Sequence, residues 1–233
     1  MPLPTLETPT YTLSLPSTKQ KVDYRPFLVK EEKVLMIAQQ SEDQTAIFRA
    51  MLDVVDACTF GKLMVEKLSN VDLEFILLKL RGKSVGESVE VKMLCDDCQH
   101  GNPVSINLDD IKVKYPRKKA DPKIQLTDSV GVICAFPTVK ALMSVKKDDP
   151  AEIIASAIET IFDADNTYSV EDETPEEVAK FIDSLTFSQL KKIQDFISSA
   201  PKISHTVKYD CKECGKKGIS KVIEGAESFL AFA

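Results

Sequence analysis

Four of the six cysteines fall into two Cys-x-x-Cys pairs, Cys95 with Cys98 and Cys211 with Cys214. Thiolates at this spacing, presented by a tight turn, are typical ligands of Zn²⁺. Four of them complete a tetrahedral site that has no open position for a substrate. The sequence therefore predicts one structural zinc ion bound by these four side chains.

The distance between the pairs is unusual for a zinc site. Zinc-binding pairs are commonly separated by roughly 15–20 residues, whereas here residues 99–210 intervene. Two disulfides, a redox dithiol, or a site in which His100 replaces one cysteine are the alternatives. A disulfide between cysteines three apart is strained, and a thioredoxin-type pair opens a helix after a strand, which neither pair does.

Alternating apolar and polar residues flank both pairs and predict that each lies at the tip of a β-hairpin. The alternation runs through residues 89–94, 104–108, 205–209 and 219–223. A glycine follows each second cysteine closely, and we expect Gly101 and Gly215 to adopt the positive φ that such a turn needs. These hairpins are the elements that would position the four sulfurs.

Composition and charge exclude several classes of protein. No apolar run approaches the ~18 residues that cross a bilayer, and the N-terminus lacks the regions of a signal peptide. With unpaired thiols expected, this predicts a cytoplasmic protein in which Cys58 and Cys134 are inert core residues. A net charge of -6 argues against broad nucleic-acid binding. The basic stretch at residues 112–119 nevertheless keeps a nucleic-acid-binding alternative open, together with Lys216, Lys217 and Lys221 near the second pair.

The remaining elements are predicted from periodicity and capping residues. A hairpin is expected at residues 11–25, and helices at residues 30–40, 43–58 and 71–80. Beyond residue 117 we expect mostly helices, after a short strand near residues 131–135. Their start signals lie at residues 149–152, 174–177 and 186–189. Their apolar stripes are Ile154, Ile158, Ile161; Val178, Phe181, Ile182, Leu185; and Leu190, Ile193, Phe196, Ile197.

The fold class that follows is α+β, mainly helical with β-hairpins and a split zinc ribbon, in which a helical insertion separates the two Cys-x-x-Cys turns. We expect residues 1–233 to form a single discontinuous unit. Its parts are an N-terminal hairpin (1–29), a helical segment (30–86), the zinc ribbon (87–116 and 203–226) and the mainly helical insertion (117–202).

No catalytic constellation is found in the sequence, and a cysteine-saturated zinc site has no position for water activation. The prediction is therefore a protein that is not an enzyme and acts by binding other proteins. Two apolar segments are candidates for the partner surface, since exposed apolar area usually marks a binding site. Leu73 and Leu77 represent the third helix, and Phe229 and Phe232 represent the C-terminal tail.

Several segments spread along the chain resemble a known protein family. They are LPST at residues 15–18, YRPFLVKEEK at 24–33, FIDSLT at 181–186, Phe196, Pro201, CKECG at 211–215, Glu224-Gly225 and Phe229. With these segments the chain resembles the baseplate hub assembly proteins of T4-type contractile-tailed bacteriophages. The ending at residues 229–232 departs from the paired aromatic residues expected in that family.

The resemblance implies a non-enzymatic role in building the central hub of a phage baseplate. The partners would be hub proteins, with no membrane and no small-molecule substrate. The protein would act in the cytoplasm of the infected bacterium as an assembly chaperone, or remain in the virion baseplate as a hub component. The alternative function is a zinc-ribbon nucleic-acid binder or viral transcription regulator.

Overall fold

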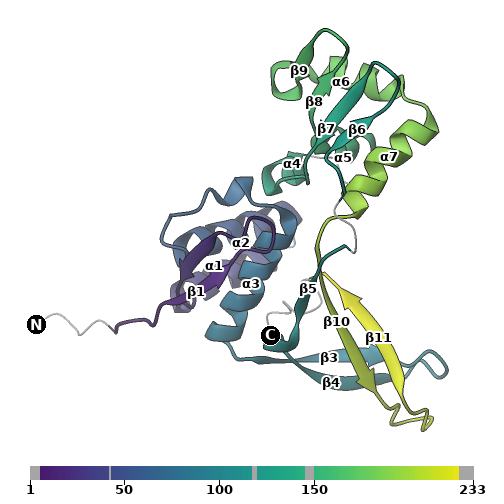
Figure 1. Ribbon diagram of the computed structural model, residues 1–233. Coiled ribbons are helices and arrows are strands. Elements are labelled where there is room, and N and C mark those ends of the chain that lie inside the picture. The colour runs from purple at the N-terminus through teal and green to yellow at the C-terminus, as the bar shows by residue number, and fades with distance from the viewer. Residues whose placement is uncertain (1–5, 42, 117–119, 145–149, 226–233) are drawn as a thin grey trace, which may run out of the picture. The chain divides into compact units, whose positions relative to one another are not determined.

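A computed structural model describes residues 6–41, 43–116, 120–144 and 150–225. The fold is α+β, with about 40% helix and 27% strand in several small sheets. The prediction of a mainly helical protein is therefore wrong. The chain divides into two compact units (Figure 1), unit 1 with residues 1–65, 71–114 and 202–233, and unit 2 with residues 66–70 and 115–201. That the two pack together as one body stays a prediction.

The first part of unit 1 is a hairpin followed by helices, as the periodicity predicts. Asp43 caps the second helix, accepting a hydrogen bond from the Thr45 amide at 2.9 Å. The third helix is buried on most sides, with Ile76 at 0% exposure. The elements are β1 (Tyr11–Ser14), β2 (Lys21–Tyr24), α1 (Val29–Gln40), α2 (Gln44–Cys58), η1 (Val65–Lys67) and α3 (Asn70–Ser84). Residues 66–70, which include the end of η1 and the first residue of α3, belong to unit 2.

The second part of unit 1 contains both Cys-x-x-Cys turns, each at the end of an antiparallel pair of strands as predicted. Strands β3 (Ser88–Leu94) and β4 (Gly101–Asn107) form a two-stranded sheet. A 3₁₀ turn, η2 (Leu108–Asp110), then leads to β5 (Lys112–Lys114). The second turn joins β10 (Lys202–Tyr209) to β11 (Ile219–Glu224), and β10 also pairs with β5 in a three-stranded sheet ordered β11-β10-β5.

Unit 2 is a four-stranded antiparallel sheet with helices, where the sequence predicted helices and one short strand near residues 131–135. Its order is β6-β7-β8-β9. The strands are β6 (Lys123–Gln125), β7 (Gly131–Cys134), β8 (Ile158–Phe162) and β9 (Thr167–Ser169). The helical elements are α4 (Val139–Ser144), α5 (Pro150–Ala157), η3 (Val170–Asp172), α6 (Pro175–Asp183) and α7 (Phe187–Ser198).

The stripe Ile154, Ile158, Ile161 was predicted to be one helix face, and this is wrong. Helix α5 ends at Ala157, and Ile158 begins strand β8. Three β-branched residues lie between positions 158 and 161, and such residues pack well on a pleated sheet. Ile161 pairs with Val132 of β7 on one side and Tyr168 of β9 on the other. Cross-strand pairing therefore outweighs the helical spacing here.

Two of the predicted helix starts are confirmed in detail. Thr174 and Glu177 form a capping box at α6, and Thr186 and Gln189 form one at α7. The start signal at residues 149–152 falls partly outside the described residues, although α5 begins at Pro150. The stripes of α6 and α7 pack on the sheet in one core, made of Leu126, Val132, Cys134, Ile154, Ile158, Val178, Ile182, Ile193 and Phe196. Within the ranges described, no helix is long and apolar enough to cross a membrane.

Candidate metal centre

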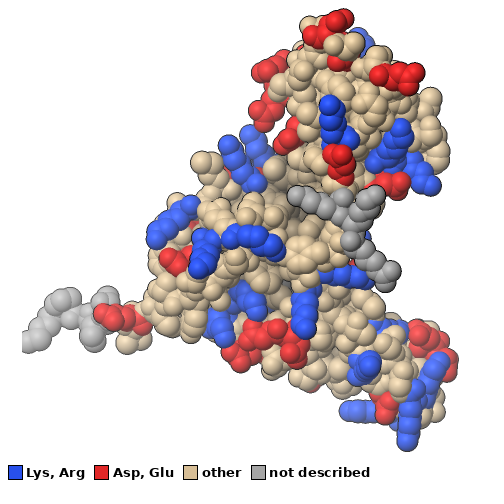
Figure 2. All heavy atoms as spheres, in the orientation of Figure 1, with Lys and Arg blue, Asp and Glu red and all other residues tan. Residues whose placement is uncertain are grey.

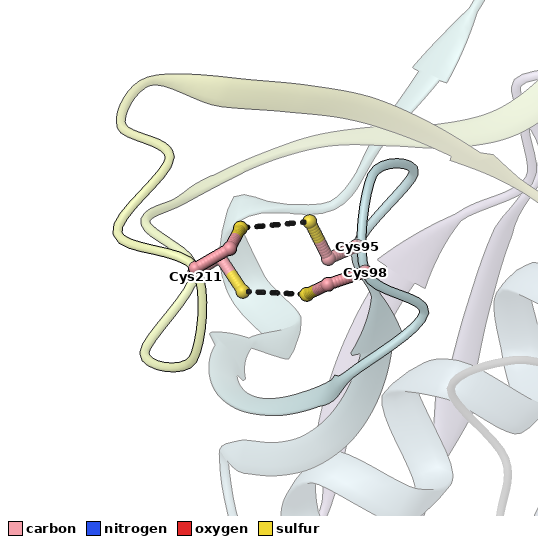
Figure 3. A group of neighbouring side chains, drawn as sticks. Cys95, Cys98 and Cys211 are labelled. Atoms are coloured by element: carbon pink, nitrogen blue, oxygen red, sulfur yellow. Dashed lines mark hydrogen bonds between the residues drawn. The ribbon is translucent and has the colours of Figure 1, made fainter.

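The two turns bring the four predicted ligands together. The four Sγ atoms all lie within 4.8 Å of one another. The Sγ atoms of Cys95 and Cys214 are 3.7 Å apart, and those of Cys98 and Cys211 are 3.5 Å apart. Figure 3 shows Cys95 and Cys98 on one turn pointing toward Cys211 on the other. All four are free thiols, since a disulfide would need about 2.05 Å between sulfurs.

These separations suit a tetrahedral metal site. Four sulfurs at about 2.3 Å from a zinc ion lie about 3.8 Å from one another, which is the edge of the tetrahedron. These two Sγ–Sγ distances are within a few tenths of an ångström of that edge, and the other pairs lie within 4.8 Å. Soft thiolates select Zn²⁺ among the abundant divalent ions. The arrangement and the donor set therefore fit the predicted ion.

Both turns are built by the same backbone hydrogen bonds. The amide of Cys95 donates to the carbonyl of His100 at 2.9 Å, and the amide of Cys211 donates to the carbonyl of Lys216 at 2.8 Å. In each turn the residue after the second cysteine donates back to the first cysteine's carbonyl, Gln99 at 2.9 Å and Gly215 at 3.1 Å. The two halves of the site therefore have the same local geometry.

The positive φ was predicted at Gly215 and Gly101, and only the first is correct. Gly215 has φ +72°. In the first turn Gln99 takes the equivalent position with φ +57°, while Gly101 is already in strand β4, paired with Leu94. A Cβ at Gly101 would lie 2.1 Å from the Lys92 side chain. Gly101 is therefore suited to close packing against a neighbouring strand rather than to a left-handed turn.

Asn102, which the sequence analysis did not identify, connects the two turns. Its side chain is 1% exposed, and its Nδ2 donates to the His100 carbonyl at 3.1 Å and lies 3.6 Å from the Cys211 Sγ. Its Oδ1 accepts from the Lys212 amide at 2.9 Å. Groups that hydrogen-bond to ligands orient them and tune their basicity. The only sequence signal was a polar residue at an inward position of a strand.

The same contacts shape the electrostatics of the sulfurs. Amide hydrogen bonds, first from Cys214 and then from Glu213, lower the pKa of Cys211 to about 6. The His100 amide acts in the same direction on Cys98, but burial and hydrogen bonds among the sulfurs raise the pKa of Cys98 to about 12. A thiolate at one position therefore opposes ionisation of its neighbour. A cation bound between the sulfurs would favour their thiolate forms, and zinc is such a cation.

A ring of polar contacts holds the hairpins together around the cysteines. The Tyr209 hydroxyl and the Lys221 ammonium both donate to the Leu94 carbonyl, at 2.8 and 2.6 Å. Lys221 also pairs with Asp96 at 2.6 Å, and Lys216 pairs with Asp97 at 2.8 Å. Acidic and basic side chains lie intermixed over the ends of these hairpins (Figure 2). These two lysines are therefore engaged with carboxylates rather than forming a basic surface for phosphates.

The other predicted binding residues have different positions. Leu73 and Leu77 are 2% and 6% exposed, so their side chains belong to the core of unit 1 and offer no surface to a partner. This corrects the expectation for the helix, which is apolar because it is central. Phe229 and Phe232 lie outside the described residues. Of the basic stretch, Lys112 and Lys114 are exposed on strand β5, while residues 117–119 are likewise outside the description.

Comparison with protein families identifies the chain. Residues 8–231 match the family described as T4 bacteriophage base plate protein. The chain belongs to this base plate family. The match covers nearly the whole length, so both units and both Cys-x-x-Cys turns are part of the family's domain. The resemblance to T4-type baseplate proteins is thereby confirmed. No curated protein and no solved structure matched the chain.

Proposed function

We propose that this base plate family protein is a non-enzymatic assembly factor or component of the baseplate hub, and that it binds hub proteins. The observation that supports this most is the family match over residues 8–231. The chemistry of the site agrees, since the one cluster of metal-binding side chains among the described residues consists of four cysteines. Four thiolates fill the coordination of zinc and leave no place for a reacting water.

The second part of the proposal is that Cys95, Cys98, Cys211 and Cys214 bind a structural Zn²⁺. Zinc would neutralise part of the negative charge of four thiolates, and its coordination bonds would join the two hairpins. The residues themselves preorganise the site. Two equivalent turns aim the sulfurs, Asn102 fixes one turn against the other, and the Lys216–Asp97 pair adds an outer contact.

The consequence for function is that zinc joins parts of the chain that unit 2 separates. Cys98 and Cys211 are 113 positions apart. Between strands β5 and β10 the chain leaves unit 1, forms most of unit 2 and returns to unit 1. These two strands pair directly, with Ile203 opposite Val113. A closed metal site beyond that pair would keep this crossover of the chain fixed.

Mass spectrometry of purified virions tests which hub role applies. A hub component is present in a fixed ratio to other baseplate proteins, whereas an assembly factor is absent from virions but co-purifies with hub proteins from infected cells. In the infected cell both would act in the cytoplasm during tail assembly. Absence from virions together with no binding to any purified baseplate protein would contradict the proposal.

The nucleic-acid-binding alternative has a separate test. Its support is the exposed pair of lysines on β5, Lys112 and Lys114. Gel shifts at increasing salt would show a steep loss of binding if phosphate contacts dominated. We expect no salt-dependent binding, because Lys216 and Lys221 are held by Asp97 and Asp96.

A further inference from the structure

The end of helix α2 has a conformation that its sequence does not favour. Phe60 adopts φ +62°, in the left-handed region that a bulky L-residue rarely enters. It follows the C-cap residue Thr59, at the position where helices usually have glycine. Gly61 comes one residue later, also with positive φ (+64°). The chain therefore has a phenylalanine where glycine or asparagine would fit without strain.

The ring of Phe60 is not buried in the core. Phe60 is 45% exposed, and Met64, four residues further on, is 71% exposed. Non-glycine residues in sparsely populated conformations persist where the surroundings fix them, and they concentrate at binding sites. A strained backbone and an exposed aromatic side chain at one position together point to a use outside the chain's own core.

More exposed apolar side chains lie at the same end of the α1–α2 pair. The amide of Arg25, just before α1, donates to the carbonyl of Cys58, the last residue of α2, at 3.0 Å. Arg25 also pairs with Glu31 of α1 at 2.9 Å, so the start of α1 lies beside the end of α2. Leu28 and Val29, at the start of α1, are 38% and 64% exposed. Leu28, Val29, Phe60 and Met64 are termed the helix-end surface below.

Basic groups border this surface. Lys62 places its Nζ 5.6 Å from the centre of the Phe60 ring. The side chain of Lys30, beside Val29, is 72% exposed, and its Nζ lies 3.4 Å from the carboxylate of Glu31. A partner that buries the ring would bring its own surface against these ammonium groups. Charge complementarity therefore favours a partner whose apolar pocket has carboxylates at its rim.

We propose that the helix-end surface is where this chain docks on another baseplate protein, with Phe60 as the aromatic anchor in an apolar, acid-rimmed pocket. The proposal rests on the proposed function, because it names the surface by which a baseplate partner is bound. Aromatic anchors flanked by a polar rim are the usual source of binding energy in protein interfaces. The occupant is a protein, not a lipid surface or a second copy of this chain.

The test measures binding of the purified full-length protein to each baseplate protein of the same phage, expressed and purified singly. Phe60→Asn removes the ring and keeps a residue that tolerates positive φ. It should weaken binding roughly tenfold or more. Phe187→Asn is the matched control, since Phe187 is 78% exposed at the first position of α7 in unit 2. That variant should bind like the original protein.

Two further variants keep the proposal testable if Phe60→Asn folds poorly. Met64→Gln changes a side chain that is mostly in solvent and should also weaken binding. Lys62→Glu should weaken binding by placing an acid against the acidic rim. Stronger binding by Lys62→Glu, or equal weakening by Phe60→Asn and Phe187→Asn, would overturn the proposal.

The remaining outcomes separate this proposal from the proposed function. If no baseplate protein binds the unaltered chain, both fail. If one binds and Phe60→Asn and Met64→Gln bind it equally well, only the helix-end surface is wrong. Self-association that Phe60→Asn abolishes would assign the surface to a second copy. Binding to anionic lipid vesicles that Phe60→Asn abolishes would assign it to a membrane. Either result would overturn the proposal.

Discussion

Replacing Cys211 by serine should remove the zinc site and destabilise unit 1 as a whole. Cys211 is 3% exposed and its sulfur is 3.5 Å from that of Cys98. The metal would act as a cross-link between positions 113 residues apart. Closing a loop of that length restricts the unfolded chain by about 5 kcal/mol. We expect the free energy of unfolding of Cys211→Ser to fall by about that amount.

The assay combines metal analysis with denaturant unfolding in the presence and absence of a chelator. The unaltered protein should contain one zinc per chain and lose stability when the chelator is added. In Cys211→Ser the chelator should have little further effect, because the link is already gone. Cys134→Ser is the matched control. Cys134 is 2% exposed in the core of unit 2, where burial raises the pKa of its thiol to about 11.

The control separates loss of the metal from ordinary damage to a core. Cys134→Ser places a hydroxyl in an apolar site and should cost about 1–3 kcal/mol, yet it should retain its zinc and its response to the chelator. The reasoning would be refuted by less than half an equivalent of zinc in the unaltered protein. Equal zinc content and equal chelator response in Cys211→Ser and Cys134→Ser would refute it as well.

Three further predictions concern other parts of the structure. Asn102→Ala should weaken zinc binding by roughly 10- to 100-fold, with one ion still bound at saturation. Competition with a chromogenic chelator measures this affinity, and an unchanged affinity would show that Asn102 does not support the site. Burial raises the pKa of Glu31, but hydrogen bonds from Arg25 and Leu28 outweigh it and hold the pKa below its usual 4.5. Stability from Glu31 is therefore present above pH 4.5 and lost as the pH falls below it. Glu31→Gln should lower the free energy of unfolding by about 1–3 kcal/mol at pH 7. A difference from the unaltered protein that does not shrink as the pH is lowered would contradict this. Ile193→Ala, at a position 0% exposed in unit 2, should cost about 2–5 kcal/mol without loss of zinc, and zinc release on this change would contradict two separately packed units.

The candidate site was predictable from the sequence because its chemistry is local. Each Cys-x-x-Cys turn with its alternating flanks specifies a hairpin, and four thiols have few other uses. Asn102 was missed because its role depends on the Lys212 amide from the other hairpin, a contact that residue spacing does not encode. Gly101 was misassigned because Gln99 adopts the positive φ instead.

The errors in the fold have a similar origin. Ile154 and Ile158 are four apart, a spacing that fits a helix, but Ile158 begins a strand that pairs with Cys134. Periodicity in a short segment cannot show which neighbours will be available. Leu73 and Leu77 were ambiguous for the same reason, since an apolar helix is equally consistent with a core and with an interface. Their low exposure resolves the question in favour of the core.

The most direct test of the account is deletion of the gene from a phage that carries it, followed by electron microscopy of the tails. The account predicts that complete baseplates fail to form and that the unaltered protein supplied from a plasmid restores them. Cys211→Ser should restore them poorly, whereas Cys134→Ser should restore them well. Normal infectious tails in the absence of the protein would contradict the proposed role in building the baseplate hub.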